Sequence, residues 1–176
     1  WVLAGLVLGW AARLGTYLFR RVHREGKDGR FDHIKTSPSA FLVAWTLQGF
    51  WTLIVPLPVL ILLLKNETMG PITWVQVTGL VIWATGFLIE VIADGQKASF
   101  RHAPENRGQW INTGLWARAQ HPNYFGEIVL WTGLAIVGVP VYEGFEWLAV
   151  LSPLVTLFLL TKVSGVPMVR ARNEKR

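Results

Sequence analysis

The sequence contains no cysteine in its 176 residues. This absence excludes disulfide bonds, thiolate nucleophiles and cysteine-based zinc or iron–sulfur sites. The four histidines show no HxxxH or HxxEH spacing, so we expect no catalytic metal. The glycine-rich motifs GxGxxG and GxxxxGK[ST] are missing too. Any nucleotide would therefore be bound by polar side chains at helix ends.

Charged residues are scarce, at 16% of the chain, whereas 52% of the residues are hydrophobic and ten are tryptophan. A soluble domain carries about one quarter charged residues, so this composition argues against a soluble protein. The net charge of +6 would by itself suggest a nucleic-acid-binding protein. The positions of the charges, described below, lead us to expect no nucleic-acid partner.

Five apolar segments approach the length needed to cross a bilayer. We therefore expect an all-α, multi-pass transmembrane bundle that forms one domain over residues 1–176. The chain begins abruptly inside an apolar stretch, which suggests that it has lost its start, and the resemblance described below implies that its other end is shortened as well. The expected segments are Trp1–Leu18, Ala40–Leu64, Pro71–Ala93, Tyr124–Val139 and Gly144–Thr161.

Lysine and arginine are concentrated in alternate connections. Of the 17 basic residues, 15 lie in segments 19–39 and 95–120 or in the tail from Lys162. The positive-inside rule predicts that these three segments face the cytoplasm. The simplest interpretation is that the charges only set the topology. The basic loops also contain Asp, His, Asn and Trp, however, and a topology signal does not need that variety.

Proline and glycine positions indicate how the helices pack. Pro56 and Pro58 predict a kink in the second segment. Glycines seven residues apart lie nearly on one face of a helix, and we expect them to permit close helix packing. These glycines are Gly79 and Gly86 in the third segment and Gly126 and Gly133 in the fourth.

The third segment carries a stripe of ionisable residues at spacings of four, three and four. Glu90, Asp94, Lys97 and Arg101 share one face if the helix continues out of the membrane. On a solvated helix end they would simply form ion pairs. Glu90 differs because it lies inside the apolar segment, where an unpaired carboxylate is expensive. It requires a donor from another helix or from a ligand.

The fourth segment carries a second polar face. Pro122 suits a first helical turn, with Gln120 or His121 near the cap. Asn123, Glu127 and Trp131 then recur at every fourth position, which suits a ligand with a polar head and a flat ring. Alternatively, Trp131 is ordinary packing and Glu127 pairs with Arg13 or Arg118. A helix amino terminus with Arg118 and His121 beside it favours an anion such as phosphate.

The block GLWARAQHPNYFGEIVLW resembles the signature of a bacterial membrane-reductase family of unknown physiological substrate, which is similar to the carboxy-terminal domain of steroid 5-alpha-reductases. The same block is more distantly similar to sterol reductases and isoprenylcysteine carboxyl methyltransferases, which share a His-Pro-x-Tyr core. The resemblance runs from about Leu6 to the tail and implies a bacterial inner-membrane protein. It is strongest between Glu90 and Trp131.

The resemblance implies a reductase that binds NADPH from the cytoplasm, with the nicotinamide inside the bundle and a lipophilic substrate reached among the membrane lipids. The steroid enzymes carry an Asn at the position of Glu90 and an Arg at that of Gln109, which leaves the detailed contacts open. The positions that match the cofactor-binding motif, or lie beside it, are Asp94, Arg101, Asn123, Glu127, Trp131, Glu90, Arg118, His121, Tyr124 and, in the first basic loop, Arg24.

The implied reaction is hydride transfer from NADPH to the beta carbon of an enone, while a tyrosine and an upstream acid polarise the carbonyl oxygen. Here Trp10 stands at the position of that tyrosine, and the helices that would bring the acid are absent. Tyr17, seven residues later on a similar face, is a candidate substitute.

Three functions are compatible with these patterns. The first is the NADPH-dependent reductase of a steroid-like, isoprenoid or fatty enone. The second is a membrane methyltransferase that uses S-adenosylmethionine, which the shared His-Pro-Asn-Tyr block permits. The third is a non-enzymatic or degenerate membrane scaffold. Binding of NADPH, of S-adenosylmethionine or of neither distinguishes them.

Overall fold

A computed structural model describes residues 1–26, 32–65 and 70–163 of the chain. This described part is all-helical, without a β-strand, as expected. Short 3₁₀ segments connect or extend the main helices. The α-helices are α1 (Val2–Glu25), α2 (Asp32–Thr36), α3 (Pro38–Ile54), α4 (Leu57–Leu64), α5 (Trp74–His102), α6 (Pro122–Gly138) and α7 (Leu151–Phe158).

Four segments are long and apolar enough to span a membrane: Val2–Arg24, Trp74–His102, Pro122–Val141 and Gly144–Val163. If the bent pair α3 and α4 is counted as one further span, the described residues contain five. The chain is therefore a multi-pass membrane protein. Helices α1 and α5 continue seven and nine residues beyond Leu18 and Ala93, where the apolar segments end, so the condition for one polar stripe on α5 is met. Helical structure persists through the polar residues that follow each apolar run.

The second span is broken between α3 and α4, with a bend of 49°. Pro56 and Pro58 lack backbone N–H groups, so they remove two helical hydrogen bonds. The Val59 amide donates to the Pro56 carbonyl, and the carbonyl of Val55 accepts instead from the Ser152 hydroxyl of α7, at 2.5 Å. The prediction of a proline kink is confirmed, and α7 supplies the hydrogen bond that the break leaves open.

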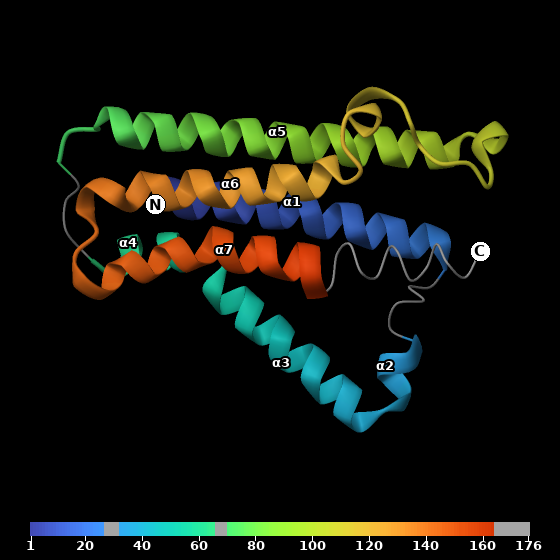
Figure 1. Ribbon diagram of the computed structural model, residues 1–176, viewed down its shortest axis with the longest axis horizontal. Coiled ribbons are helices and arrows are strands. Elements are labelled where there is room, and N and C mark those ends of the chain that lie inside the picture. Colours follow the sequence, from blue (N-terminus) through green and yellow to red (C-terminus); the bar gives the residue numbers. More distant parts are fainter. Residues whose placement is uncertain (27–31, 66–69, 164–176) are drawn as a thin grey trace.

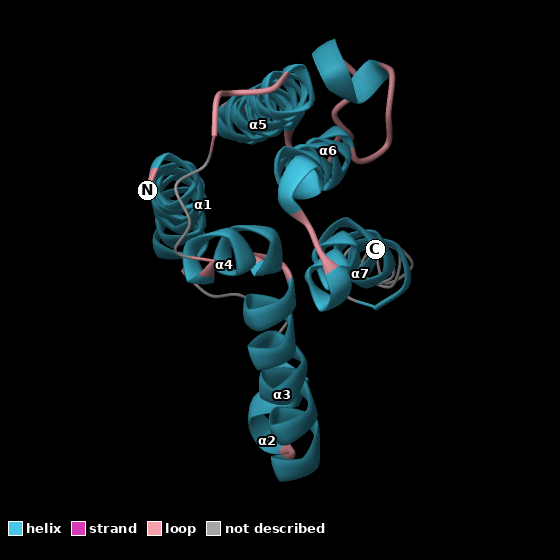
Figure 2. Cartoon of the chain, turned by 90° about the vertical axis from the view of Figure 1, so that its left-hand side faces the viewer, coloured by secondary structure: helices cyan, strands magenta, loops and turns pink. Residues whose placement is uncertain are grey.

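Helices α5 and α6 lie antiparallel and side by side (Figures 1 and 2). Glycines form their contact: a methyl group on Gly86 would lie 2.4 Å from the Leu130 amide nitrogen, and one on Gly79 would lie 2.8 Å from the Gly133 carbonyl oxygen. Gly126 is equally close to the backbone of α5. The expected close helix packing is confirmed, and it fixes the register between the two helices.

Viewed end-on, α1 and α6 lie on opposite sides of α5, and α4 and α7 close the lower side of the bundle (Figure 2). Helix α3 extends away from the other helices (Figure 1) and has no buried residue. The buried core joins α1, the α3–α4 junction, α4 and α6. Its members are Trp10, Val55, Val59, Leu130, Trp131 and Leu134.

Candidate functional site

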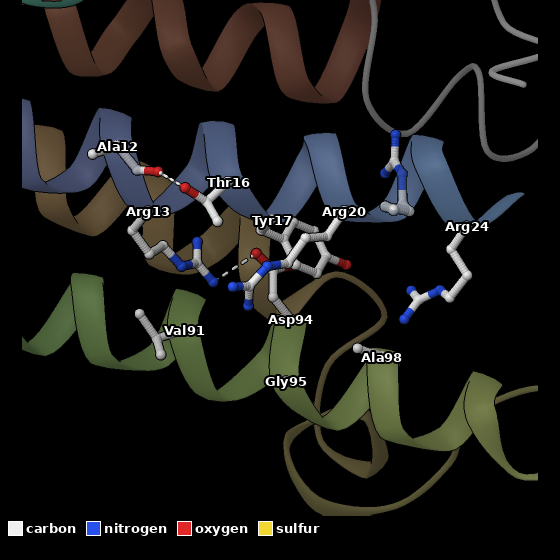
Figure 3. A pocket seen from close by; sticks show the side chains of 11 residues that line it. Ala12, Arg13, Thr16, Tyr17, Arg20, Arg24, Val91, Asp94, Gly95 and Ala98 are labelled. Atoms are coloured by element: carbon white, nitrogen blue, oxygen red, sulfur yellow. Dashed lines mark hydrogen bonds and ion pairs between the residues drawn. The ribbon is translucent and has the colours of Figure 1, made fainter. Parts of the chain in front are cut away.

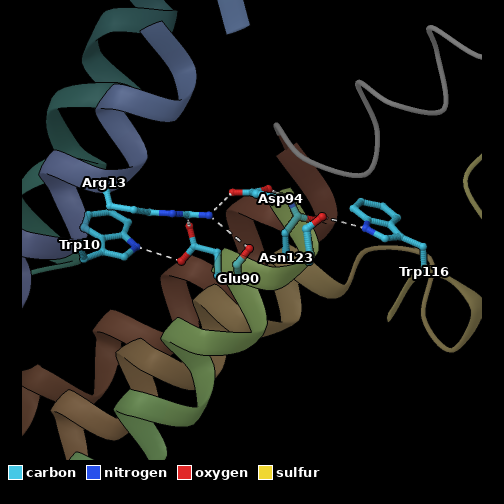
Figure 4. Close-up of polar contacts among 7 residues, drawn as sticks. Trp10, Arg13, Glu90, Asp94, Trp116 and Asn123 are labelled. Carbon is cyan, nitrogen blue, oxygen red and sulfur yellow. Dashed lines mark hydrogen bonds and ion pairs between the residues drawn. The ribbon is translucent and has the colours of Figure 1, made fainter. Parts of the chain in front are cut away.

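A buried ion-pair network joins α1 to α5 (Figure 4). The Arg13 guanidinium donates to the Glu90 carboxylate at 2.7 Å and to the Asp94 carboxylate at 2.8 Å. The Trp10 indole N–H donates to the other oxygen of Glu90 at 3.0 Å. The two acidic side chains are only 3% and 4% exposed. The partner that Glu90 requires is therefore supplied by another helix, and both donors come from α1.

Helix α6 contributes a second set of polar groups beside this network. Asn123 donates from its side-chain amide to Asp94 at 3.3 Å, and its own oxygen is buried without a partner among the described residues. Glu127 and Trp131 follow on the same side, 8% and 1% exposed. The Trp131 indole N–H also has no acceptor within the described residues. This face therefore retains hydrogen-bonding capacity that the described residues do not use.

Glu127 forms no ion pair with Arg13 or Arg118, so the alternative in which either arginine is its ion-pair partner is wrong. Arg13 is instead engaged by Glu90 and Asp94. Glu127 nevertheless interacts electrostatically with Glu90, Asp94 and Arg13. Two of the three buried carboxyl groups thus pair with one guanidinium, and Glu127 lies outside that pairing. We call the group Arg13, Glu90, Asp94, Asn123 and Glu127 the polar cluster.

Two members of the polar cluster, Arg13 and Asp94, line a cleft of about 600 Å³ between α1 and α5 (Figure 3). Arg13 and Asp94 lie at its inner end, and Tyr17 follows one turn further along α1, with its ring centroid 5.6 Å from the Arg13 guanidinium carbon. Arg20, Arg21 and Arg24 continue along the same wall; we call them the basic rim. Small side chains of both helices complete the lining.

Helices α1 and α5 run in the same direction, so their last turns lie at one end of the bundle (Figure 1). Arg24 and His102 are hydrogen-bonded there. Sequence reasoning proposed Arg24 but missed Arg13, Arg20 and Arg21 as cleft residues. The spacing of Arg13, Arg20 and Arg24 along α1, at seven and four residues, could have identified a basic face.

The remaining predicted residues lie around the start of α6 or at the end of α5. Pro122 begins α6 and His121 is its N-cap residue, as the sequence suggested. The His121 side chain makes no capping hydrogen bond. The His121 ring stacks on Tyr124 at 5.2 Å between centroids. Arg101 and Arg118 are exposed, so neither belongs to the buried polar cluster.

The loop before α6 is attached to α5. The Trp116 indole N–H donates to the Ala93 carbonyl at 2.9 Å, and the Leu115 amide donates to the Gln96 side chain at 2.9 Å. The Lys97 ammonium lies 4.4 Å from the centre of the Trp116 ring. These contacts hold the loop that leads into α6 against the last turns of α5. Gln96 was not singled out from the sequence because its partner is a backbone amide 19 residues away.

Comparison with known proteins adds two partial relatives. A 76-residue stretch is 30% identical to the probable O-methyltransferase ustE of Ustilaginoidea virens and covers 40% of this chain and 27% of the relative. A 66-residue stretch is 35% identical to the steroid 5-alpha-reductase DET2 of Arabidopsis thaliana and covers 36% of this chain and 24% of the relative. The chain thus spans about a quarter of the length of these relatives.

No solved structure matches the chain. One family model, described as "Protein of unknown function (DUF1295)", matches residues 1–176. That match covers the network between α1 and α5, the polar face of α6 and the basic rim alike. The chain therefore belongs to the DUF1295 family.

Proposed function

We propose that this chain is the cofactor-binding core of a membrane reductase that uses NADPH to reduce the C=C bond of a lipophilic enone. The observation that carries the proposal is the cleft between α1 and α5, which joins a basic rim to a buried polar cluster. The partial similarity to a steroid 5-alpha-reductase supports the same assignment.

The basic rim suits a ligand that bears phosphate groups. Arginine binds phosphate with paired, charge-assisted hydrogen bonds. Arg13 and Arg24 are 11 residues apart on α1, which corresponds to about 16 Å along a helix axis. This length suits an extended dinucleotide, and a volume of about 600 Å³ is typical of a cofactor pocket.

The inner end of the cleft suits the nicotinamide. Asn123 donates to Asp94 at this end, and its unpaired oxygen is a hydrogen-bond acceptor for the carboxamide or for a ribose hydroxyl. Glu127 lies one turn further along α6, behind the residues that line the cleft. Trp10, which donates to Glu90, and Trp131 pack with their rings 5.0 Å apart in the hydrophobic core. The residues present therefore fit the cofactor at both ends.

When bound, NADPH supplies the hydride. The chain must then bind the phosphates with the basic rim, orient the ring with Asn123, and polarise the substrate carbonyl. Trp10 does not suit the last task because its N–H is engaged by Glu90. Tyr17 lines the cleft beside Arg13, so we propose its hydroxyl as the donor to that carbonyl. The cleft opens at the end bearing the basic loops, for which we propose a cytoplasmic orientation.

A methyltransferase that uses S-adenosylmethionine is the second candidate. It is supported by the partial similarity to a probable O-methyltransferase. S-adenosylmethionine carries no phosphate, however, so this function gives the basic rim no ligand to bind. We therefore rank it below the reductase. A scaffold that binds neither molecule is the third candidate, and it would leave the unpaired groups of α6 without a function.

The test is a binding titration of the purified protein in lipid nanodiscs with NADPH and with S-adenosylmethionine. We expect saturable binding of NADPH alone. Arg20→Gln or Arg24→Gln should weaken it about tenfold, the size of one charged hydrogen bond. Asn123→Ala should weaken it as well. Arg107→Gln, an exposed arginine outside the cleft, is the matched control and should bind like the wild type.

Binding of S-adenosylmethionine without NADPH would overturn the reductase in favour of the methyltransferase, and binding of neither would support the scaffold. If NADPH binds equally well to wild type, Asn123→Ala and Arg24→Gln, the site is elsewhere. Oxidation of bound NADPH across a panel of steroid-like, isoprenoid and fatty enones then tests the reaction, and Tyr17→Phe should slow it.

A further inference from the structure

The cleft between α1 and α5 is lined by charged side chains of mainly one sign. Four of its eleven lining residues are arginines, and Asp94 is the one acid among them. Asp94 is paired with Arg13 at the inner end. The lining therefore carries an excess of positive charge, centred on the basic rim, and favours an anionic ligand.

The cleft is also exposed along the part of α1 that lies within the membrane. Ala12 and Thr16 line it, are exposed, and belong to the candidate span Val2–Arg24 (Figure 3). Arg20 and Arg24 line the same cleft at the end of that span. In a bilayer the exposed wall at Ala12 and Thr16 therefore faces acyl chains, and the basic rim lies near the headgroups.

The exposed wall continues along α1 away from the basic rim. Gly5, Gly9, Ala12 and Thr16 recur every three or four residues, so they share one face of the helix, and all four are exposed. A methyl group added to Gly5 or Gly9 would have no atom within 4 Å. These small residues leave space beside α1, so an apolar chain that leaves the cleft can lie along the helix.

We propose that the cleft binds one anionic phospholipid, whose phosphate contacts the basic rim and whose acyl chains follow the exposed face of α1. Basic pockets between membrane helices bind anionic headgroups. A free phosphate ion would contact the arginines but not the apolar wall, so a lipid fits more of the cleft. A zwitterionic lipid fits less well, because the arginines repel its ammonium group.

Lipid binding does not rest on the proposed function, because it uses only the charge and the exposure of the cleft. Its consequence for that function does. The phosphates of NADPH and of the lipid would contact the same arginines, so the lipid must leave before NADPH binds. An anionic phospholipid is therefore a competitor of NADPH, and more of it in the membrane lowers the apparent affinity for the cofactor.

The experiment titrates the whole chain in a neutral detergent with dioctanoyl phosphatidylglycerol, and native mass spectrometry counts the bound lipid. We expect one saturable site. Dioctanoyl phosphatidylcholine and glycerol 3-phosphate should each bind about tenfold more weakly or less. Arg20→Gln should weaken the binding of phosphatidylglycerol about tenfold, the size of one charged hydrogen bond. Arg107→Gln, at an exposed position outside the cleft, is the control and should bind like the wild type.

The apolar wall is tested by Ala12→Leu, which narrows the exposed part of the cleft and leaves its charge unchanged. We expect this variant to lose affinity for phosphatidylglycerol. Ala11→Leu is the matched control, since Ala11 is exposed on the same helix but does not line the cleft.

Glycerol 3-phosphate that binds as tightly as phosphatidylglycerol would overturn the lipid in favour of a free phosphate, and equal binding of phosphatidylcholine would overturn the role of the arginines. Unchanged binding by Arg20→Gln, or equal losses in Ala11→Leu and Ala12→Leu, would overturn the assignment to this cleft. NADPH is then added to the lipid-bound protein. If NADPH binds and the lipid stays, the proposed cofactor site is wrong and the lipid site stands.

Discussion

Helix α5 has neighbours on two sides, and it contacts them in different ways (Figure 2). Towards α6 its surface is glycine, and the two backbones touch: a methyl group on Gly86 would meet the Leu130 amide. Towards α1 its surface carries Glu90 and Asp94, and the helices are joined through the long side chain of Arg13. One contact is made by backbone shape and the other by charge.

This difference indicates how the site is built. The close α5–α6 contact fixes Glu90 and Asp94 relative to Asn123, because it leaves no room for either helix to shift. The α1–α5 contact has a cleft beside it, and the residues that hold it together are the same ones that we expect to meet the ligand. We therefore expect substitutions on the α6 side to affect folding and those on the α1 side to affect folding and binding together.

The largest effect should come from Gly86→Leu, which inserts a side chain where the α6 backbone lies within 2.4 Å. Overpacking costs about 1–3 kcal/mol when neighbours can move. Here the obstacle is the backbone of a buried helix, so we expect loss of the folded protein. The measurement is the yield of monodisperse protein in detergent and its thermal unfolding.

Gly9→Leu is the matched control, since Gly9 is exposed on α1 and a methyl group added to it would have no atom within 4 Å. We expect this variant to fold like the wild type. Comparable loss of protein from both substitutions would show that the glycine contact is not what distinguishes α6 from α1.

The second-largest loss of stability should come from Arg13→Met, which removes the cation from two buried carboxylates. Breaking a buried ion pair from one side costs about 3–5 kcal/mol, because the remaining charges lose their partner. The combination of Arg13→Met with Glu90→Gln and Asp94→Asn should recover much of this free energy. Unfolding by heat or denaturant, measured in one detergent, gives the comparison.

A single Arg13→Met variant as stable as the wild type would mean that the network contributes nothing to the position of α1. Arg13→Lys provides a graded control. It keeps the charge and loses the paired geometry of the guanidinium, so its stability should lie between those of Arg13→Met and the wild type.

Local sequence patterns were sufficient for the α6 side. The seven-residue spacing of Gly86 and Gly79 predicted the close packing, and the four-residue spacing of Asn123 and Glu127 predicted one polar face. Hydropathy identified the spans, and the spacing of the polar stripe indicated how α5 continues beyond its apolar run.

The α1 side could not be obtained in this way. Arg13 and Glu90 are 77 residues apart, so no local spacing links them, and only the arrangement of the helices brings them together. The sequence nevertheless indicated that Glu90 needs a partner. It could not indicate which arginine supplies one, and Arg13 was considered only as an alternative partner of Glu127.

The smallest effect should come from Trp116→Phe, which concerns the loop that connects α5 to α6. The variant keeps a ring beside Lys97 and removes the indole N–H that donates to the Ala93 carbonyl at 2.9 Å. We expect a loss of about 1 kcal/mol, the net value of one hydrogen bond. Because the glycine contact holds α6 independently, NADPH affinity should change less than in Asn123→Ala. A larger loss of affinity in Trp116→Phe would mean that the loop, and not the α5–α6 contact, holds Asn123 beside Asp94.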